Sequence, residues 1–280
     1  MGKHLVEELL LAGHDVTVAT RGISPDGFGN QVTRLKLDRT SAESLKEHIP
    51  KMEYDVVFDD LAYCSKDVKC LLDLVRCRKY IHISSMSVYD SLHNDIKEIE
   101  FDPEQKKLVY CSRQDFPYDE VKRQAECAIV QDYPHIPSIR VRFPFVIGPD
   151  DYTQRLFFYV EHILDQKPMY VDNPKAQMAF VRSDEAGKFL AYLAQTDFQG
   201  AINGASEQTV SVEQIAEYVK TKTGKEMLLS VEGEKAPYNG AEDYSLNIDK
   251  AKSLGFSFTP LRDWVYDLID LLILQAGEKS

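Results

Sequence analysis

The chain has 280 residues and a net charge of −12, with 33 lysines and arginines against 45 aspartates and glutamates. This length can bury one large core or two interleaved lobes, and the acidic balance argues against binding of a nucleic-acid backbone. The five cysteines show no metal-ligand spacing, and neither a signal peptide nor a membrane-spanning apolar run is visible. We therefore expect a cytoplasmic protein with reduced thiols, without a metal site or a membrane partner.

Helical and strand patterns alternate over the first two-thirds of the chain. The spacing of Leu5, Leu9 and Ala12 predicts an opening helix that ends at Gly13. β-rich or apolar runs predict strands at 15–20, 32–37, 55–58, 80–83 and 139–143, with helices at 41–49 and 119–130. This alternation is typical of an α/β fold in which helices cover both faces of a doubly wound parallel sheet.

The second half of the chain has a more mixed pattern. Residues 90–114 are polar and irregular, and we interpret them as a loop near the site. After residue 148, helices are predicted at 153–164, 183–194 and 212–222. These segments indicate a second lobe over the end of the sheet, where open parallel sheets bind ligands.

One tyrosine and one lysine have the spacing of a proton-transfer pair. Tyr118 and Lys122 share one face if they lie on a helix. An ammonium near a phenol lowers the phenol pKa from ~10, which makes tyrosine a general acid/base near neutral pH. Tyr218 and Lys222 have the same spacing, but only the first pair lies between two predicted strands. Ser85 ends a predicted strand and can orient a substrate oxygen, or merely satisfy backbone groups there.

Several motifs follow one another in a fixed order. They are Ser-Ser-Met-Ser-Val-Tyr at 84–89, Tyr118-x-x-x-Lys122, Arg-Phe-Pro-Phe-Val-Ile-Gly-Pro at 142–149, Phe-Val-Arg-Ser-Asp-Glu-Ala at 180–186, Ile-Asn-Gly at 202–204 and Ala-Lys-Ser-Leu-Gly-Phe at 251–256. This set resembles the extended short-chain dehydrogenase/reductases, the group of NAD-dependent epimerases and dehydratases. The resemblance covers nearly the whole chain. It implies a Rossmann-like NAD(P)-binding part at 1–148, to which 178–204 returns, and a smaller, mainly substrate-binding lobe at 149–280.

The resemblance also implies roles for individual residues. Ser85, Tyr118 and Lys122 become the catalytic set, in which Lys122 also holds the nicotinamide ribose. Further residues expected at the cofactor are Gly2, Asp38, Leu61, Ala62, Tyr63, Pro144 and Tyr118 itself. A homodimer is a family-level expectation.

The choice of cofactor depends on the end of the strand at 15–20. NAD-preferring sites place an acid there, whereas an arginine suits the 2′-phosphate of NADP. The segment reads Ala-Thr-Arg-Gly at 19–22, with no acid. We therefore favour NADP over NAD, with Arg21 as a cofactor-binding residue; the alternative is that Arg21 is a solvated loop residue.

The chain departs from the family pattern at its beginning. The family's glycine motif follows its first strand, and here only Gly2 can be the last of those glycines. Without that strand the sheet would lack a central member. Either Met1 is an internal methionine with residues lost upstream, or the chain is short and binds cofactor poorly. We favour the first hypothesis, because a gap in a parallel sheet leaves backbone groups unpaired.

The predicted function is that of an NAD(P)-dependent oxidoreductase, epimerase or dehydratase. It would act on a hydroxyl or carbonyl of a small substrate, and a nucleotide sugar is the commonest substrate class in the family. The alternatives are a non-catalytic NAD(P)-sensing regulator, an RNA-binding relative of the same fold, or a truncated product without activity. The Ser85, Tyr118 and Lys122 set opposes the first two, and the net charge of −12 opposes RNA.

Overall fold

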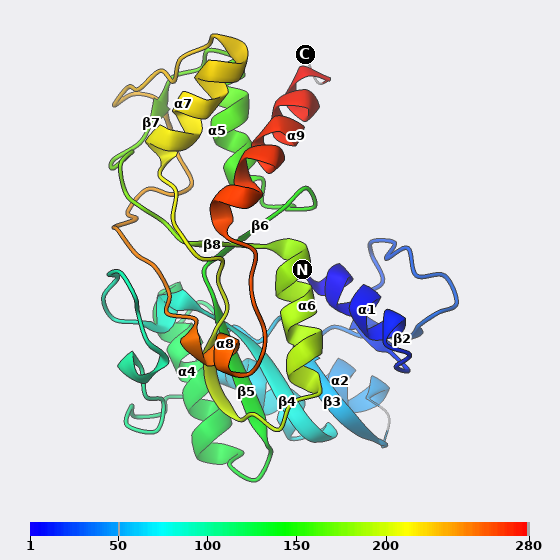
Figure 1. The fold of residues 1–280 in the computed structure, drawn as a ribbon. Helices are drawn as coiled ribbons and strands as arrows, with labels where there is room; N and C mark the ends of the chain where they lie inside the picture. The colour runs from blue at the N-terminus through cyan, green and yellow to red at the C-terminus, as the bar shows by residue number, and fades with distance from the viewer. Residues whose placement is uncertain (50, 279–280) are drawn as a thin grey trace.

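Parallel strands form two sheets in the lower half of the molecule (Figure 1). The computed structural model describes residues 1–49 and 51–278. The larger sheet has the order β3–β4–β5–β9, comprising Glu53–Asp59, Arg76–Ser85, Ser138–Phe143 and Gly200–Asn203. β1 (Thr17–Thr20) and β2 (Thr33–Lys36) form a separate parallel pair. No strand within the described residues pairs with both β1 and β3, so the strands do not complete a single sheet.

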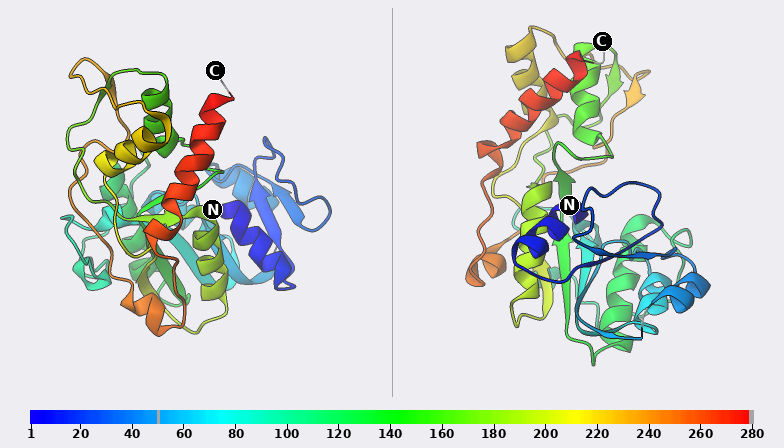
Figure 2. Two further views of the ribbon diagram at one scale, coloured as in Figure 1. Left: turned by 45° about the horizontal axis from the view of Figure 1, so that its top comes forward. Right: turned by 90° about the vertical axis from the view of Figure 1, so that its right-hand side faces the viewer.

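Helices cover both faces of the larger sheet, which confirms the predicted α/β class (Figure 2). On one face lie α1 (Gly2–Leu11) and α6 (Ser183–Ala194), and on the other α3 (Ser65–Leu72) and α4 (Tyr118–Asp132). α2 (Ala42–His48) links β2 to β3. α1 and α6 approach closely at Gly187, where a Cβ atom would lie 2.7 Å from the backbone nitrogen of Leu5. Glycine at this position therefore sets the spacing of the two helices.

The upper half contains the remaining helices and short strands (Figure 1). Its elements are β6 (Phe145–Ile147), α5 (Arg155–Leu164), β7 (Met169–Tyr170), β8 (Phe180–Arg182), α7 (Val212–Thr223), β10 (Glu234–Lys235) and α9 (Val265–Gly277). β6 pairs with β8, and β7 with β10. α8 (Asp249–Ser253) descends to the lower half and packs near β9. One hydrophobic core extends from Ile83 of β4 to Leu268 of α9, so the two halves are packed together.

Local sequence signals explain several helix ends. The Ser41 hydroxyl accepts a hydrogen bond of 3.1 Å from the Ser44 backbone and begins α2. α7 begins with a reciprocal capping box between Ser211 and Gln214 and ends at Gly224, whose φ is 73°. None of the helices in the described part of the chain is long and apolar enough to span a bilayer.

Candidate active site

Lys122 is buried where α4 crosses the carboxyl ends of β3 and β4. Its Nζ donates hydrogen bonds to the carbonyl oxygens of Ala62 (3.0 Å) and Ile83 (2.7 Å). An ammonium has three protons, so one remains without a partner among the described residues. Burial lowers the pKa of Lys122 to about 8, although nearby carboxylates, Asp59 foremost, act in the opposite direction.

Tyr118 is the first residue of α4 and is half exposed at the mouth of this site. Loss of hydration raises its pKa, and a hydrogen bond with Ser85 acts in the opposite direction. The net pKa of Tyr118 is therefore raised rather than lowered as expected, because loss of hydration is the largest effect on it. Two of the Lys122 protons are directed at backbone carbonyls rather than at the phenol.

Ser85 lies at the end of β4 and satisfies backbone groups there, which was one of the two roles considered from the sequence. Its Oγ accepts hydrogen bonds from the backbone nitrogen (3.2 Å) and the hydroxyl (3.0 Å) of Ser87, and so caps the short helix η1 (Met86–Val88). Its own proton remains for the hydrogen bond with Tyr118, which favours the phenolate. The structure thus brings Ser85, Tyr118 and Lys122 to one strand end.

Tyr63 lies beside both Tyr118 and Lys122. Its ring centroid is 6.1 Å from that of Tyr118 and 5.4 Å from the Lys122 ammonium. The Arg113 guanidinium lies 4.6 Å from the same ring and donates to Asp67 (2.9 Å) and to the Leu61 carbonyl (2.8 Å). Sequence reasoning placed the loop at 90–114 near the site but did not single out Arg113. A lone arginine in a polar loop has no periodicity that could reveal it.

Arg21 and Asp38 lie together at the ends of β1 and β2. The hydroxyl (2.7 Å) and the backbone N–H (2.9 Å) of Thr40 donate hydrogen bonds to the Asp38 carboxylate and lower its pKa. The charges of Arg21 and Arg113 add to this effect. Arg21 itself is exposed. The structure therefore brings the charges of two arginines near Asp38, which is one of the residues predicted at the cofactor.

Gly2 and Pro144 are the remaining residues that were predicted at the cofactor. Gly2 begins α1, and a Cβ atom there would lie 3.3 Å from the Asp60 carboxylate. Loss of hydration raises the pKa of Asp60, whereas the positive charges of the N-terminal ammonium and Lys122 act to lower it. Asp59 instead turns to Arg39 and the Tyr80 hydroxyl, so the two neighbouring acids do not form a pair. Pro144 is buried between β5 and β6.

A buried ion pair fixes α4 to the strands beneath it. Arg142 of β5 donates two hydrogen bonds to Glu126 of α4, at 2.7 and 3.0 Å. The Ser84 hydroxyl donates to the same carboxylate at 2.6 Å, and Arg142 also donates to the Glu98 carbonyl at 2.8 Å. Because Ser84 precedes Ser85 and Glu126 follows Lys122 by one helical turn, this network holds the catalytic candidates in place.

His82 is buried beneath the same helix. Its ring stacks on Tyr80 at 6.4 Å, but both ring nitrogens are buried without hydrogen-bond partners in the described structure. Burial and the nearby charges of Lys122, Arg39 and Arg140 hold its pKa well below 6.5, so the ring is neutral. In the described ranges, no group of three or more His, Cys, Asp or Glu side chains could hold a metal ion.

The second tyrosine–lysine pair has a different environment. Tyr218 and Lys222 both bind the Asp270 carboxylate, at 3.1 and 2.8 Å, on the surface of the upper half. The pair is a helix–helix contact between α7 and α9, away from any strand end. Spacing alone therefore does not distinguish the two pairs, whereas position in the fold does.

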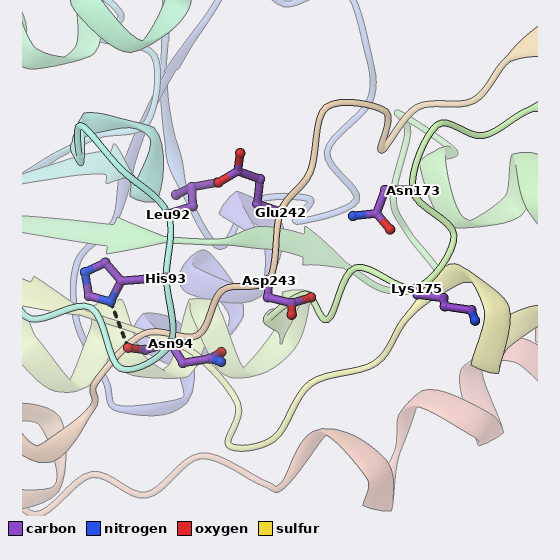
Figure 3. A pocket seen from close by; sticks show the side chains of 7 residues that line it. All are labelled: Leu92, His93, Asn94, Asn173, Lys175, Glu242 and Asp243. Carbon is purple, nitrogen blue, oxygen red and sulfur yellow. Dashed lines mark hydrogen bonds between the residues drawn. The ribbon is translucent and has the colours of Figure 1, made fainter.

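A pocket of about 490 Å³ lies apart from these residues (Figure 3). It is formed by three segments, and its lining residues are Leu92, His93, Asn94, Asn173, Lys175, Glu242 and Asp243. None of Ser85, Tyr118 and Lys122 lines it. The proton-transfer candidates therefore lie outside this pocket.

Comparisons with solved structures agree with the fold. One similar solved structure is a UDP-glucuronic acid 4-epimerase from Bacillus cereus in complex with NAD, with 20% identity, 97% of this chain and 95% of that chain covered, and a TM-score of 0.70. A second is a UDP-glucose 4-epimerase from Thermotoga maritima with UDP-glucose, with 17% identity, 99% and 95% of the two chains covered, and a TM-score of 0.74. A third is a UDP-glucose 4-epimerase from Thermus thermophilus in complex with NAD, with 15% identity, 97% and 95% of the two chains covered, and a TM-score of 0.70. At these identities the likeness shows the fold.

The sequence comparisons differ in what they find. A search of curated protein sequences found no match. The model of the NAD dependent epimerase/dehydratase family matches residues 1–205, which is most of the chain. The chain therefore belongs to the NAD-dependent epimerase/dehydratase family.

Proposed function

We propose that this chain is a nicotinamide-dependent enzyme in which Tyr118 transfers the proton to or from a substrate oxygen. The observation that supports this most directly is the convergence of Tyr118, the Ser85 hydroxyl and the buried Lys122 ammonium at one strand end. Lys122 has one proton left for a further acceptor, and Tyr118 is accessible to a small molecule. The surface pair Tyr218 and Lys222, bound to Asp270, has no comparable arrangement.

Each residue has a defined part in the proposal. Since burial raises the pKa of Tyr118, the free chain holds it as a phenol, ready to donate to a substrate carbonyl. The Ser85 hydroxyl orients the substrate oxygen and stabilises the phenolate after proton transfer. The Lys122 ammonium adds positive charge behind the phenol. A bound nicotinamide would supply the matching hydride chemistry: the reduced form would give hydride to the carbonyl carbon, and the oxidised form would accept it in the reverse direction.

The chain's residues fit a nicotinamide dinucleotide in two places. The uncommitted proton of Lys122 suits a ribose hydroxyl, and Ala62 and Tyr63 border the same strand end. At the other end Arg21 lies near Asp38, and the charge of Arg113, which packs on Tyr63, also reaches this carboxylate. We propose NADP as the preferred cofactor because guanidinium groups suit a 2′-phosphate. Titration with NADH and NADPH tests this, and tighter binding of NADH would overturn it.

We propose a nucleotide sugar as the substrate, handled in the cytoplasm. The three similar structures named above are epimerases of UDP-glucose or UDP-glucuronic acid, and family membership makes this class the first to test. We further propose that the chain acts without nucleic acid and as a homodimer, which sedimentation would check.

The decisive experiment replaces Tyr118 by Phe. Turnover of UDP-glucose and UDP-glucuronic acid is followed by chromatography of the products with each cofactor. Loss of one proton-transferring group is expected to slow turnover by about 10²- to 10⁴-fold. Tyr218→Phe is the matched control and should leave turnover unchanged. Equal turnover by wild type and Tyr118→Phe would refute the assigned role, and salt-sensitive binding of RNA without any turnover would favour the RNA-binding alternative.

A further inference from the structure

The turn at 61–63, between β3 and α3, is held by two cations that come from different parts of the chain. The Leu61 carbonyl accepts a hydrogen bond of 2.8 Å from Nη2 of Arg113. The next carbonyl, that of Ala62, accepts a hydrogen bond of 3.0 Å from Nζ of Lys122. Because the two carbonyls are neighbours in one turn, a movement of Arg113 would also move the group that anchors Lys122.

The Tyr63 ring is a second link between the two cations. Its centroid lies 4.6 Å from the Arg113 guanidinium carbon and 5.4 Å from the Lys122 ammonium, and its edge contact with the Tyr118 ring is 6.1 Å. Such cation–π contacts favour one orientation of the ring. The Asp67 carboxylate accepts from both the Tyr63 backbone nitrogen and Nε of Arg113, each at 2.9 Å. Arg113 therefore fixes the backbone and the ring of the residue that contacts both members of the proton-transfer pair.

Arg113 belongs to the polar loop at 90–114, and this loop is fastened to the start of α3. The Ser65 hydroxyl donates to the Val109 carbonyl and accepts from the Cys111 backbone nitrogen, both at 2.8 Å. Ser65 and Cys111 are buried. The loop therefore holds Arg113 at the site before any ligand binds.

We propose that Arg113 is a positioning residue for proton transfer, which fixes the turn at 61–63 and the Tyr63 ring and thereby directs the Lys122 ammonium. Two of the ammonium protons are held by carbonyls of this turn and of β4, so the direction of the third depends on where the turn lies. The assignment rests on the proposed function, in which the third proton serves a ribose hydroxyl beside the proton donor.

The first measurement follows the titration of Lys122 without any ligand, by the ¹³Cε signals of labelled lysines. The signal that is lost in Lys122→Met is that of Lys122. Arg113→Met should raise the pKa of Lys122 from about 8 toward 10.5, because a loosened turn lets water reach the ammonium. Arg113→Lys keeps the charge but not the forked donor, and should raise this pKa less. The groups that face Lys122 are the same in all variants, and they are the carboxylates of Asp59, Glu126, Asp60 and Asp67 and the neutral ring of His82.

The second measurement follows turnover with the probes and cofactors used for Tyr118→Phe. Arg113→Met and Tyr63→Leu should each lower kcat by about 10- to 100-fold, as expected when a reacting group is misplaced. The double variant should lose no more than the weaker single variant, because the guanidinium and the ring form one contact. Lys66→Met is the matched control, since it removes a hydrogen bond of 3.1 Å to Ser112 in the same loop and should leave both readouts as in wild type.

Three results would overturn the proposal. The first is an unchanged pKa of Lys122 in Arg113→Met, and the second is its full restoration in Arg113→Lys, which would show an effect of charge alone. The third is a double variant whose losses multiply, because Arg113 and Tyr63 would then act separately. The melting temperature is measured on every variant, so a folding defect is recognised. A wild type without turnover on any probe would refute the proposed function, whereas the titration of Lys122 would still decide whether Arg113 directs the ammonium.

Discussion

Replacing Lys122 by Met should change how stability depends on pH. Lys122 is 3% exposed, and burial lowers its pKa from 10.5 to about 8. One pKa unit corresponds to ~1.4 kcal/mol, so keeping the ammonium buried at pH 7 costs about 3 kcal/mol. Between pH 8 and 10.5 the unfolded chain binds the extra proton, and stability therefore rises with pH in that window. Relative to Lys122→Met, wild type should gain about 3 kcal/mol from pH 7 to pH 10.5.

The assay is urea unfolding followed by the fluorescence of Trp264, the single tryptophan, which is buried. Other groups titrate in both proteins and cancel in the difference. Lys222→Met is the matched control, because Asp270 and Tyr218 raise the pKa of Lys222 above 10.5. Its contribution is lost only above that pH, so the wild-type minus Lys222→Met difference should stay nearly constant from pH 7 to pH 10.5. A wild-type minus Lys122→Met difference that is the same at pH 7 and pH 10.5 would show that Lys122 is not a buried cation.

Three further changes test the packing around the site. His82→Met removes two unpartnered ring nitrogens and should raise the free energy of unfolding by about 1–3 kcal/mol at pH 7. The gain should be larger toward pH 5, because the pKa of the folded histidine lies well below 6.5. An unchanged free energy of unfolding in urea titrations would mean that the ring nitrogens have partners. Arg142→Met leaves Glu126 buried without its partner and should lower the free energy of unfolding by about 3–5 kcal/mol in the same titration. A loss no larger than that of a surface substitution would contradict the network. Gly187→Ala places a Cβ atom 2.7 Å from the Leu5 backbone and should cost about 1–3 kcal/mol, seen as a lower melting temperature; an unaltered melting temperature would mean that α1 moves freely on α6.

The sequence predicted the elements whose signals are local. The helix predicted at 183–194 has those bounds in α6, and the helix at 41–49 appears as α2 with Ser41 as its cap. α3 was not predicted, because Ser65–Leu72 is short and its inner face contains mainly Val68 and Leu72 between charged residues. The short strands β7 and β10 were also missed, since two-residue strands show no alternation.

In the candidate site, too, the residues with local sequence signals could be predicted and the others could not. Tyr118 and Lys122 could be found because their spacing and their place between strands are both visible in the sequence. Arg142 and Glu126 are distant in sequence, and only the packing of α4 on β5 brings them together. The direction of the Tyr118 pKa shift depends on the loss of hydration around its hydroxyl, which no local sequence pattern shows.

The ion pair between Arg142 and Glu126 has a consequence for how this protein can diversify. It joins α4 to β4 and β5, so the three candidates for proton transfer belong to one rigid block. The elements of the upper half, by contrast, are inserted between the strands of that block or follow them. We predict that mutations or loop exchanges in the upper half alter which molecules are accepted while the reaction chemistry stays intact. This separation makes the upper half the part to replace in chimeras that aim at a new substrate.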